Sequence, residues 1–207
     1  MNLCPPLALM LLCLTASHAA LAQTTDLQVS GLITPDACTV QLSRDGLIDH
    51  GTIAASSLDP DQYNVLVPYI LEIDITCSGP MLFALMGVDN RAGSSQAPDY
   101  FYGLGMNPHA PTERLGSVAL SYREPMGDGQ PLQSMASRDF GASWFAETNA
   151  YPRALMGFAR PGGRMPSPLT QLTTLLRIDT SINPAMYLTL DQEVPLDGSI
   201  SLDLHYL

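Results

Sequence analysis

Several segments of the chain alternate apolar and polar residues, the pattern of a β-strand with one buried and one exposed face. The clearest covers residues 71–77, with the sequence LEIDITC. Residues 27–33, 172–178 and 187–190 are further candidate strands, and 81–88 is a more continuous apolar run. Sixteen Gly and seventeen Pro separate these segments, and no long stretch has a helical period. The pattern therefore predicts an all-β fold of short strands joined by turns.

The last strand of the sequence has the most informative pattern. Four apolar residues alternate with polar ones and are expected to face the core: Ile200, Leu202, Leu204 and Tyr206. The polar residues Ser201, Asp203 and His205 are expected to face water. The alternation reaches almost to Leu207, and chain ends fray unless a sheet holds them. We therefore expect a partner to bind this strand.

The middle of the sequence is rich in loop-forming residues. Residues 89–111 and 124–149 contain many Gly, Ser, Pro and Asn residues and predict long loops. They carry Tyr100, Tyr102 and Trp144, which are candidates for stacking on a ligand. The interpretation that we favour is that these rings pack beneath the loops.

The first 22 residues have the features of a secretory signal peptide. An apolar run at 7–14 precedes a small-residue site that ends at Ala22. The run is too short to cross a bilayer, and no later segment is apolar enough to do so. We expect export, removal of residues 1–22, and a single domain over residues 23–207.

Charge excludes several classes of partner. The sequence has nine basic residues, all Arg, against twenty acidic ones, and a net charge of −11. This balance argues against binding to nucleic acid or to anionic lipid. Without Lys, the chain has no side-chain amine for an isopeptide cross-link.

Motifs for catalysis or metal binding are missing from the sequence. His50, His109 and His205 do not have the spacing of a metal site, and no nucleophile elbow or phosphate-binding loop is present. We therefore expect no enzyme activity, no cofactor and no metal site. Cys38 and Cys77 remain after export and predict a disulfide. Metal binding by two thiols alone is the weaker alternative.

Three features resemble pilin-type subunits of the chaperone–usher pathway of Gram-negative bacteria. They are the segment 29–38 (VSGLITPDAC), the position of Cys77 at the end of an alternating strand, and the final strand with penultimate Tyr206. Residues 49–53, 89–94 and 196–199 resemble, more narrowly, fimbrial-like proteins of proteobacteria that share a domain of unknown function.

This resemblance implies an immunoglobulin-like β-sandwich that lacks its final strand. A periplasmic chaperone would fill the resulting groove first, and another fimbrial subunit would replace it at the outer-membrane usher, by β-strand addition. The protein would pass through the periplasm to a fimbrium on the cell surface. The side chains of Ile200, Leu202, Leu204 and Tyr206 would form the core face of the last strand, next to the added strand.

The role of the segment containing Leu27, Val29, Gly31 and Ile33 stays open. It is either a donor strand for another subunit or the opening strand of this one, and only residues 23–26 would precede it after export. The spacing from Gly31 to Cys38 favours the opening strand. A subunit with a groove and no donor could only end a fibre at its tip or not polymerise, so the opening-strand interpretation favours a minor or tip role in adhesion.

A different class of function is also compatible with the sequence. The chain would then be a self-sufficient secreted β-sandwich that recognises a glycan or a protein through Tyr100, Tyr102 and Trp144. This alternative predicts a stable monomer that needs no chaperone.

Overall fold

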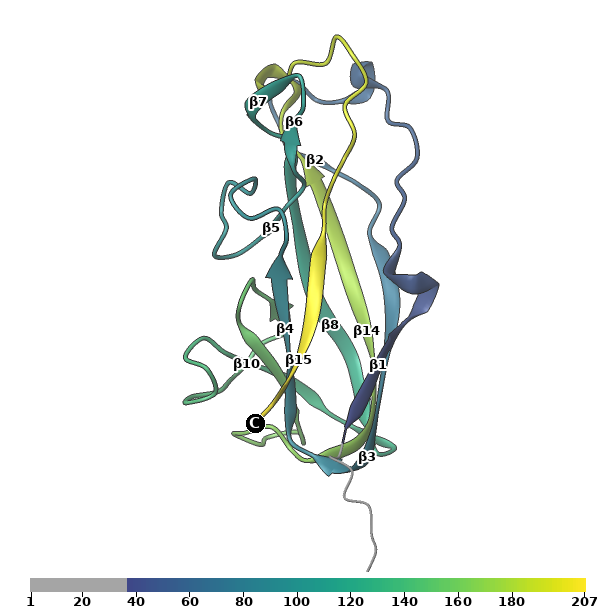
Figure 1. The fold of residues 1–207 in the computed structure, drawn as a ribbon, viewed down its shortest axis with the longest axis vertical. Helices are drawn as coiled ribbons and strands as arrows, with labels where there is room; N and C mark the ends of the chain where they lie inside the picture. Colours follow the sequence, from purple (N-terminus) through teal and green to yellow (C-terminus); the bar gives the residue numbers. More distant parts are fainter. Residues whose placement is uncertain (1–36) are drawn as a thin grey trace, which may run out of the picture. The chain divides into compact units, whose positions relative to one another are not determined.

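The computed structural model describes residues 37–207, and these residues form two antiparallel sheets with a hydrophobic core between them (Figure 1). The fold is an all-β sandwich, as the alternating pattern predicts. The predicted signal peptide, 1–22, and the segment with Leu27, Val29, Gly31 and Ile33 lie outside the described residues.

The first sheet has the strand order β1-β3-β14-β8-β12. Short strands extend it: β2 pairs with β14, and β5 and β9 pair with β8. Its strands are β1 (Cys38–Leu42), β2 (Asn64–Val65), β3 (Tyr69–Met81), β5 (Tyr102–Gly103), β8 (Gly116–Gly127), β9 (Gln130–Pro131), β12 (Asn149–Ala150) and β14 (Leu169–Ile182).

The second sheet has the order β11-β10-β13-β4-β15. Its strands are β4 (Phe83–Asp89), β10 (Gln133–Ser137), β11 (Phe145–Ala146), β13 (Leu155–Ala159) and β15 (Ile200–Tyr206). Strands β6 (Met106–Asn107) and β7 (Ala110–Arg114) form a separate pair. The 3-10 helices are η1 (Ser43–Gly46), η2 (Ala55–Ser57) and η3 (Ala185–Tyr187).

Alternation along the two longest strands builds one half of the core. In β3 the side chains of Leu71, Ile73 and Ile75 are buried, while the residues between them are exposed. Across the sandwich, the rings of Tyr122 in β8 and Phe158 in β13 make an edge contact with centroids 5.5 Å apart. Both sheets therefore contribute to one core.

Cys38 and Cys77 form the predicted disulfide. The two residues are directly opposed in the β1–β3 register, with Cα atoms 3.9 Å apart, and the bond closes a separation of 39 residues. The bridge therefore fixes the first residue of an edge strand to β3.

Two local predictions are wrong. Residues 187–190 do not form a strand: η3 ends at Tyr187 after Pro184, and no strand follows before β15. Residues 124–149 are not a long loop, because they contain the end of β8, short strands and β10 of the second sheet. The pairing of β8 with β14 shifts beside Glu124, which has a φ of 50°, and this bulge interrupts the alternation there.

Candidate functional site

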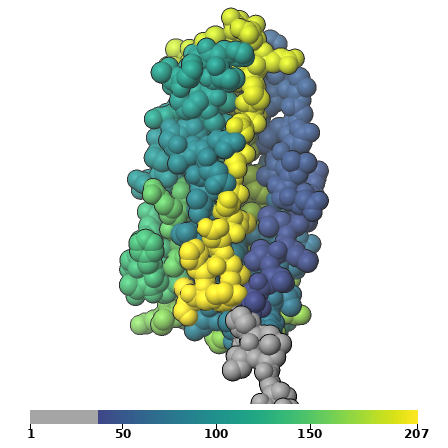
Figure 2. All heavy atoms as spheres, viewed as in Figure 1, coloured from purple at the N-terminus to yellow at the C-terminus, as the bar shows by residue number. Residues whose placement is uncertain are grey.

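One edge strand of each sheet, β1 in the first and β15 in the second, borders the same groove. Within residues 37–207, β15 pairs with β4 alone and β1 pairs with β3 alone. At one end the strands meet, because the backbone N–H of Cys38 donates to the hydroxyl of Tyr206 at 2.9 Å. Figure 2 shows the groove between the yellow segment that ends in β15 and the purple-to-blue segment that begins with β1.

Both walls of the groove present hydrophobic side chains that are only half-buried. They pack on the core from the edges without being enclosed by it. On the β1 side they are Val40, Leu42 and Ile48, and on the β15 side they are Leu188, Val194, Leu196, Ile200, Leu202 and Leu204. Unlike the central strands, these segments are not covered by any neighbouring strand among residues 37–207.

The groove continues beyond the two strands as a cavity of about 980 Å³. Residues 48–53 form one side of it and residues 188–196 the other, with Leu115 and Ile182 among its lining residues. His50 lies at this cavity, with Nε2 3.0 Å from Thr180 Oγ1 and its ring edge-on to Tyr69. Burial lowers the pKa of His50 below its ordinary value.

Strand β15 lies as the sequence pattern predicts along most of its length. Leu204 is directly opposite Leu85 of β4, and Leu202 is opposite Gly87. Leu85 and Gly87 are both buried. Tyr206 differs, because half of its surface stays exposed while its hydroxyl reaches the start of β1. The strand is therefore anchored on the β4 side and open on the other.

The expectation that His205 faces water is wrong. Its ring is half-buried, and Nε2 is buried without a hydrogen-bond partner among the described residues. The reason is that the outer face of the second sheet is covered here: Ala84, opposite His205, is fully buried. The loop after β10 lies against this end, where a Cβ added to Gly141 would be 3.9 Å from Leu207.

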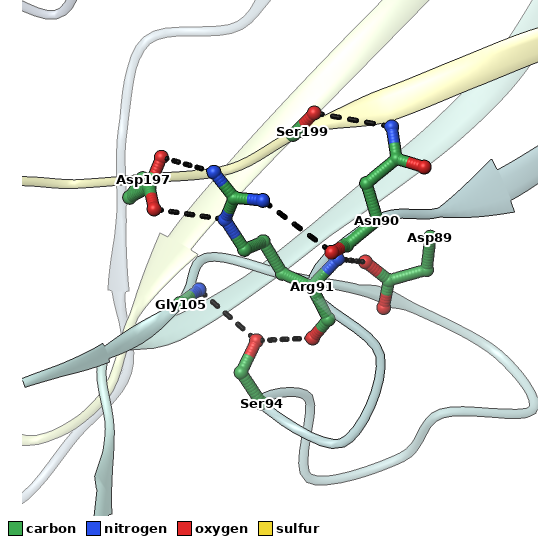
Figure 3. Close-up of polar contacts among 7 residues, drawn as sticks. All are labelled: Asp89, Asn90, Arg91, Ser94, Gly105, Asp197 and Ser199. Atoms are coloured by element: carbon green, nitrogen blue, oxygen red, sulfur yellow. Dashed lines mark hydrogen bonds and ion pairs between the residues drawn. The ribbon is translucent and has the colours of Figure 1, made fainter. Parts of the chain in front are cut away.

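A polar cluster holds the segment that leads into β15 (Figure 3). The guanidinium of Arg91 donates two hydrogen bonds of 2.8 Å to the carboxylate of Asp197. The side chain of Asn90 donates to Ser199 and Ser201, and the backbone N–H of Asn90 donates to the carbonyl of Ser199. The cluster thus joins residues 89–94 to 196–199, two of the segments that carry the resemblance.

The third of those segments, residues 49–53, lines the groove cavity. No pattern pointed to the other cavity residues Ile48 and Val194, and Leu188 was assigned to a strand that does not form. These residues lie in irregular segments, so only the folded chain brings them together.

The three candidate stacking residues are not on one surface. Tyr102 is fully buried and burial raises its pKa well above the usual range, so its proposed ligand contact is wrong. Trp144 is half-buried, donates from Nε1 to the carbonyl of Gly141, and lies against Gly157. Tyr100 remains exposed, with its ring edge-on to Tyr151.

Neither a metal site nor a membrane helix is found in the part of the chain that the structure describes. Within residues 37–207, no three His, Cys, Asp or Glu side chains gather where they would hold a metal ion. No helix in that range is long and apolar enough to cross a membrane.

Comparison with known proteins adds two similarities to this sandwich with an open groove. A family model described as a protein of unknown function (DUF1120) matches residues 27–110. Protein GltF of Escherichia coli (strain K12) is 25% identical, in an alignment that covers 88% of this chain and 88% of GltF. The family match includes β1, β3, β4 and the groove segment 49–53.

Proposed function

We propose that this chain is an exported fimbrial-like subunit that binds a β-strand of another chain between β1 and β15. The observation that carries the proposal is the pair of unpaired edges lined by half-buried hydrophobic side chains. An added strand would pair its backbone with an exposed edge and cover these side chains at the same time. Fully burying a Leu or Ile contributes about 1.5–3 kcal/mol, so covering several half-buried ones favours binding.

The proposed partners follow from the order of assembly in the chaperone–usher pathway. A periplasmic chaperone supplies the first strand, and a neighbouring subunit replaces it at the outer-membrane usher. We propose residues 1–22 as the export signal and a structural rather than catalytic role. A minor or tip position in an adhesive fibre is the corresponding proposal for its place in the assembly.

The physical reason for needing a chaperone is the exposed edge itself. An unpaired strand with apolar side chains is a template for pairing with any other chain, which leads to aggregation. A partner that binds only the folded state also stabilises it by mass action.

Co-expression with a chaperone of this pathway tests the proposal. We expect the periplasmic yield of the full chain to rise at least several-fold, and the two chains to co-purify. Deletion of residues 204–207 removes three of the seven residue pairs between β15 and β4 and the Tyr206 contact, so it should abolish the rise.

A matched variant separates loss of the groove from a general loss of folding. Asp203→Ala changes an exposed residue on the opposite face of β15 and should preserve the chaperone-dependent yield. Equal yields of the intact and shortened chains, with or without the chaperone, would contradict the proposal. They would favour a self-sufficient binding module instead.

A further inference from the structure

Hydrogen bonds at the two ends of β15 show which of its backbone groups point into the groove. The carbonyl of Ser199 accepts from Asn90, and the N–H of Leu207 donates to Leu82, so both odd-numbered residues pair on the β4 side. Successive residues of an antiparallel strand point their N–H and C=O groups to opposite edges. The free backbone groups therefore belong to the even-numbered residues: Ile200, Leu202, Leu204 and Tyr206.

The free edge of β1 has the same arrangement. The carbonyl of Ala37 accepts from the N–H of Ser78, which places Ala37 on the β3 side. The backbone groups of Val40 and Leu42 therefore point into the groove. Because the Tyr206 hydroxyl closes the groove at its base, an added strand has its open route at the other end, through the cavity of about 980 Å³.

The walls of this cavity continue the unpaired backbone. Within residues 37–207, the N–H groups of Ile48 and Thr52 on one wall form no hydrogen bond, nor do those of Leu190, Asp191 and Val194 on the other. An extended peptide can pair with such groups. The cavity is therefore a continuation of the strand-binding groove.

The charge of the cavity is one-sided. Three carboxylates line it, those of Asp49, Asp191 and Glu193, and no Arg among residues 37–207 does so. Within the described chain the side chains of Asp191 and Glu193 form no hydrogen bond or ion pair, and both residues are exposed. Burial lowers the pKa of His50, so this residue adds little positive charge at neutral pH.

Two other kinds of occupant do not match this charge. The carboxylates of the described residues do not gather in a group of three that could hold a metal ion. A second copy of this chain would bring its own net charge of −11, and Asp26 directly precedes the candidate donor segment that begins at Leu27. Complementary charge at this end of the groove has to come from a basic partner.

We propose that the groove binds a β-strand of a different protein that is apolar on its core-facing side and carries Lys or Arg beside Asp191 and Glu193. The inference rests on the proposed function and adds the chemistry of the partner. The groove edges and the half-buried side chains provide the pairing and the apolar contact. The cavity carboxylates select the charge of the residues that follow.

Binding of synthetic peptides to the exported, disulfide-bonded chain tests this assignment. The probes are fluorescent peptides of alternating Val and Ser that carry Lys, Gln or Glu at both ends, titrated by anisotropy. At low ionic strength we expect the Lys peptide to bind about tenfold more tightly than the Glu peptide, with the Gln peptide between them. Added salt should shrink this difference, because the carboxylates are exposed.

A double variant assigns the preference to the cavity. Asp191→Asn with Glu193→Gln should reduce the difference between the Lys and Glu peptides to about threefold or less, since both charges that face the ligand are removed. The affinity of the Gln peptide and the melting temperature should stay the same. Asp99→Asn with Glu124→Gln is the matched control: it changes the net charge equally at exposed positions outside the cavity and should keep the full preference.

The outcomes separate this inference from the proposed function. If none of the three peptides binds saturably, the strand-binding groove itself is refuted. If all three bind with equal affinity, the groove stands and the basic partner is ruled out. An equal loss of preference in the two double variants would assign the effect to net charge and overturn the inference. Tighter binding of a peptide of residues 23–33 than of the Lys peptide would do the same, and would make a second copy the occupant.

Discussion

At the scale of single residues, one hydrogen bond joins the two walls of the groove. The Tyr206 hydroxyl accepts from the Cys38 backbone N–H, so the last residue of β15 is tied to the first residue of β1. Cys38 is also disulfide-bonded to Cys77. This end of the groove is therefore closed by bonded contacts, while its other end widens into the cavity beside His50.

Replacing Tyr206 by Phe removes only the hydroxyl. We expect the free energy of unfolding to fall by about 1 kcal/mol, the typical net contribution of a hydrogen bond. Urea denaturation measures this change, and hydrogen exchange of the Cys38 amide should become faster. Tyr187→Phe is the control, because Tyr187 is exposed and its hydroxyl has no hydrogen bond within the described chain. Unchanged exchange at Cys38 would contradict the role given to this contact.

His50 predicts a pH dependence of stability. Because burial lowers its pKa in the folded state, the unfolded chain takes up a proton first as the pH falls below 6.5. The stability that depends on a neutral His50 is therefore fully present above pH 6.5. It is lost as the pH falls through the lowered pKa of the folded state.

Urea denaturation on both sides of pH 6.5 measures the His50 effect. The wild-type protein should lose stability in this window, and His50→Gln should flatten the profile. His109→Gln, at an exposed position, should leave it unchanged. A His50→Gln profile as steep as that of the wild type would rule out the assignment.

At the scale of elements, alternation predicted those strands that have one core face and regular pairing. β3 follows it over its length, β15 follows it except at His205 and Tyr206, and β14 extends the predicted segment 172–178 in both directions. β8 was not predicted, although Val118, Leu120 and Tyr122 alternate along its first part, and the bulge at Glu124 changes which face the side chains meet only near its end. The candidate groove was predictable only along β15 itself, since Ile48 on the β1 side and Val194 in the segment before β15 both lie in irregular chain.

Leu202 is the β15 side chain best placed to test the groove as an element. Leu202→Ser should cost about 1–2 kcal/mol of stability, because the side chain is only half-buried. Binding of a chaperone or donor-strand peptide should weaken about tenfold, equivalent to about 1.4 kcal/mol. Calorimetry measures both quantities, with Asp203→Ala as the control on the exposed face. If Leu202→Ser loses stability but binds its partner normally, the partner's strand does not bind beside Leu202.

At the scale of the whole molecule, the disulfide limits how far the unfolded chain can expand. Closing a loop of 39 residues contributes roughly 4 kcal/mol when the effect is treated as chain entropy. The variant Cys38→Ser with Cys77→Ser should therefore lower the free energy of unfolding by about this amount. Denaturation of the double variant measures it, and mass spectrometry of the exported wild type should show no free thiol at either position.

The position of that covalent bridge has a mechanical consequence. Residue 38 is where the preceding segment enters the described fold, and Cys38 is bonded there to β3, which is paired on both sides by β1 and β14. A pulling force applied to the preceding segment would therefore pass through sulfur atoms into the interior of a sheet. Without the bridge, the same load would peel off the five-residue β1 one pair at a time.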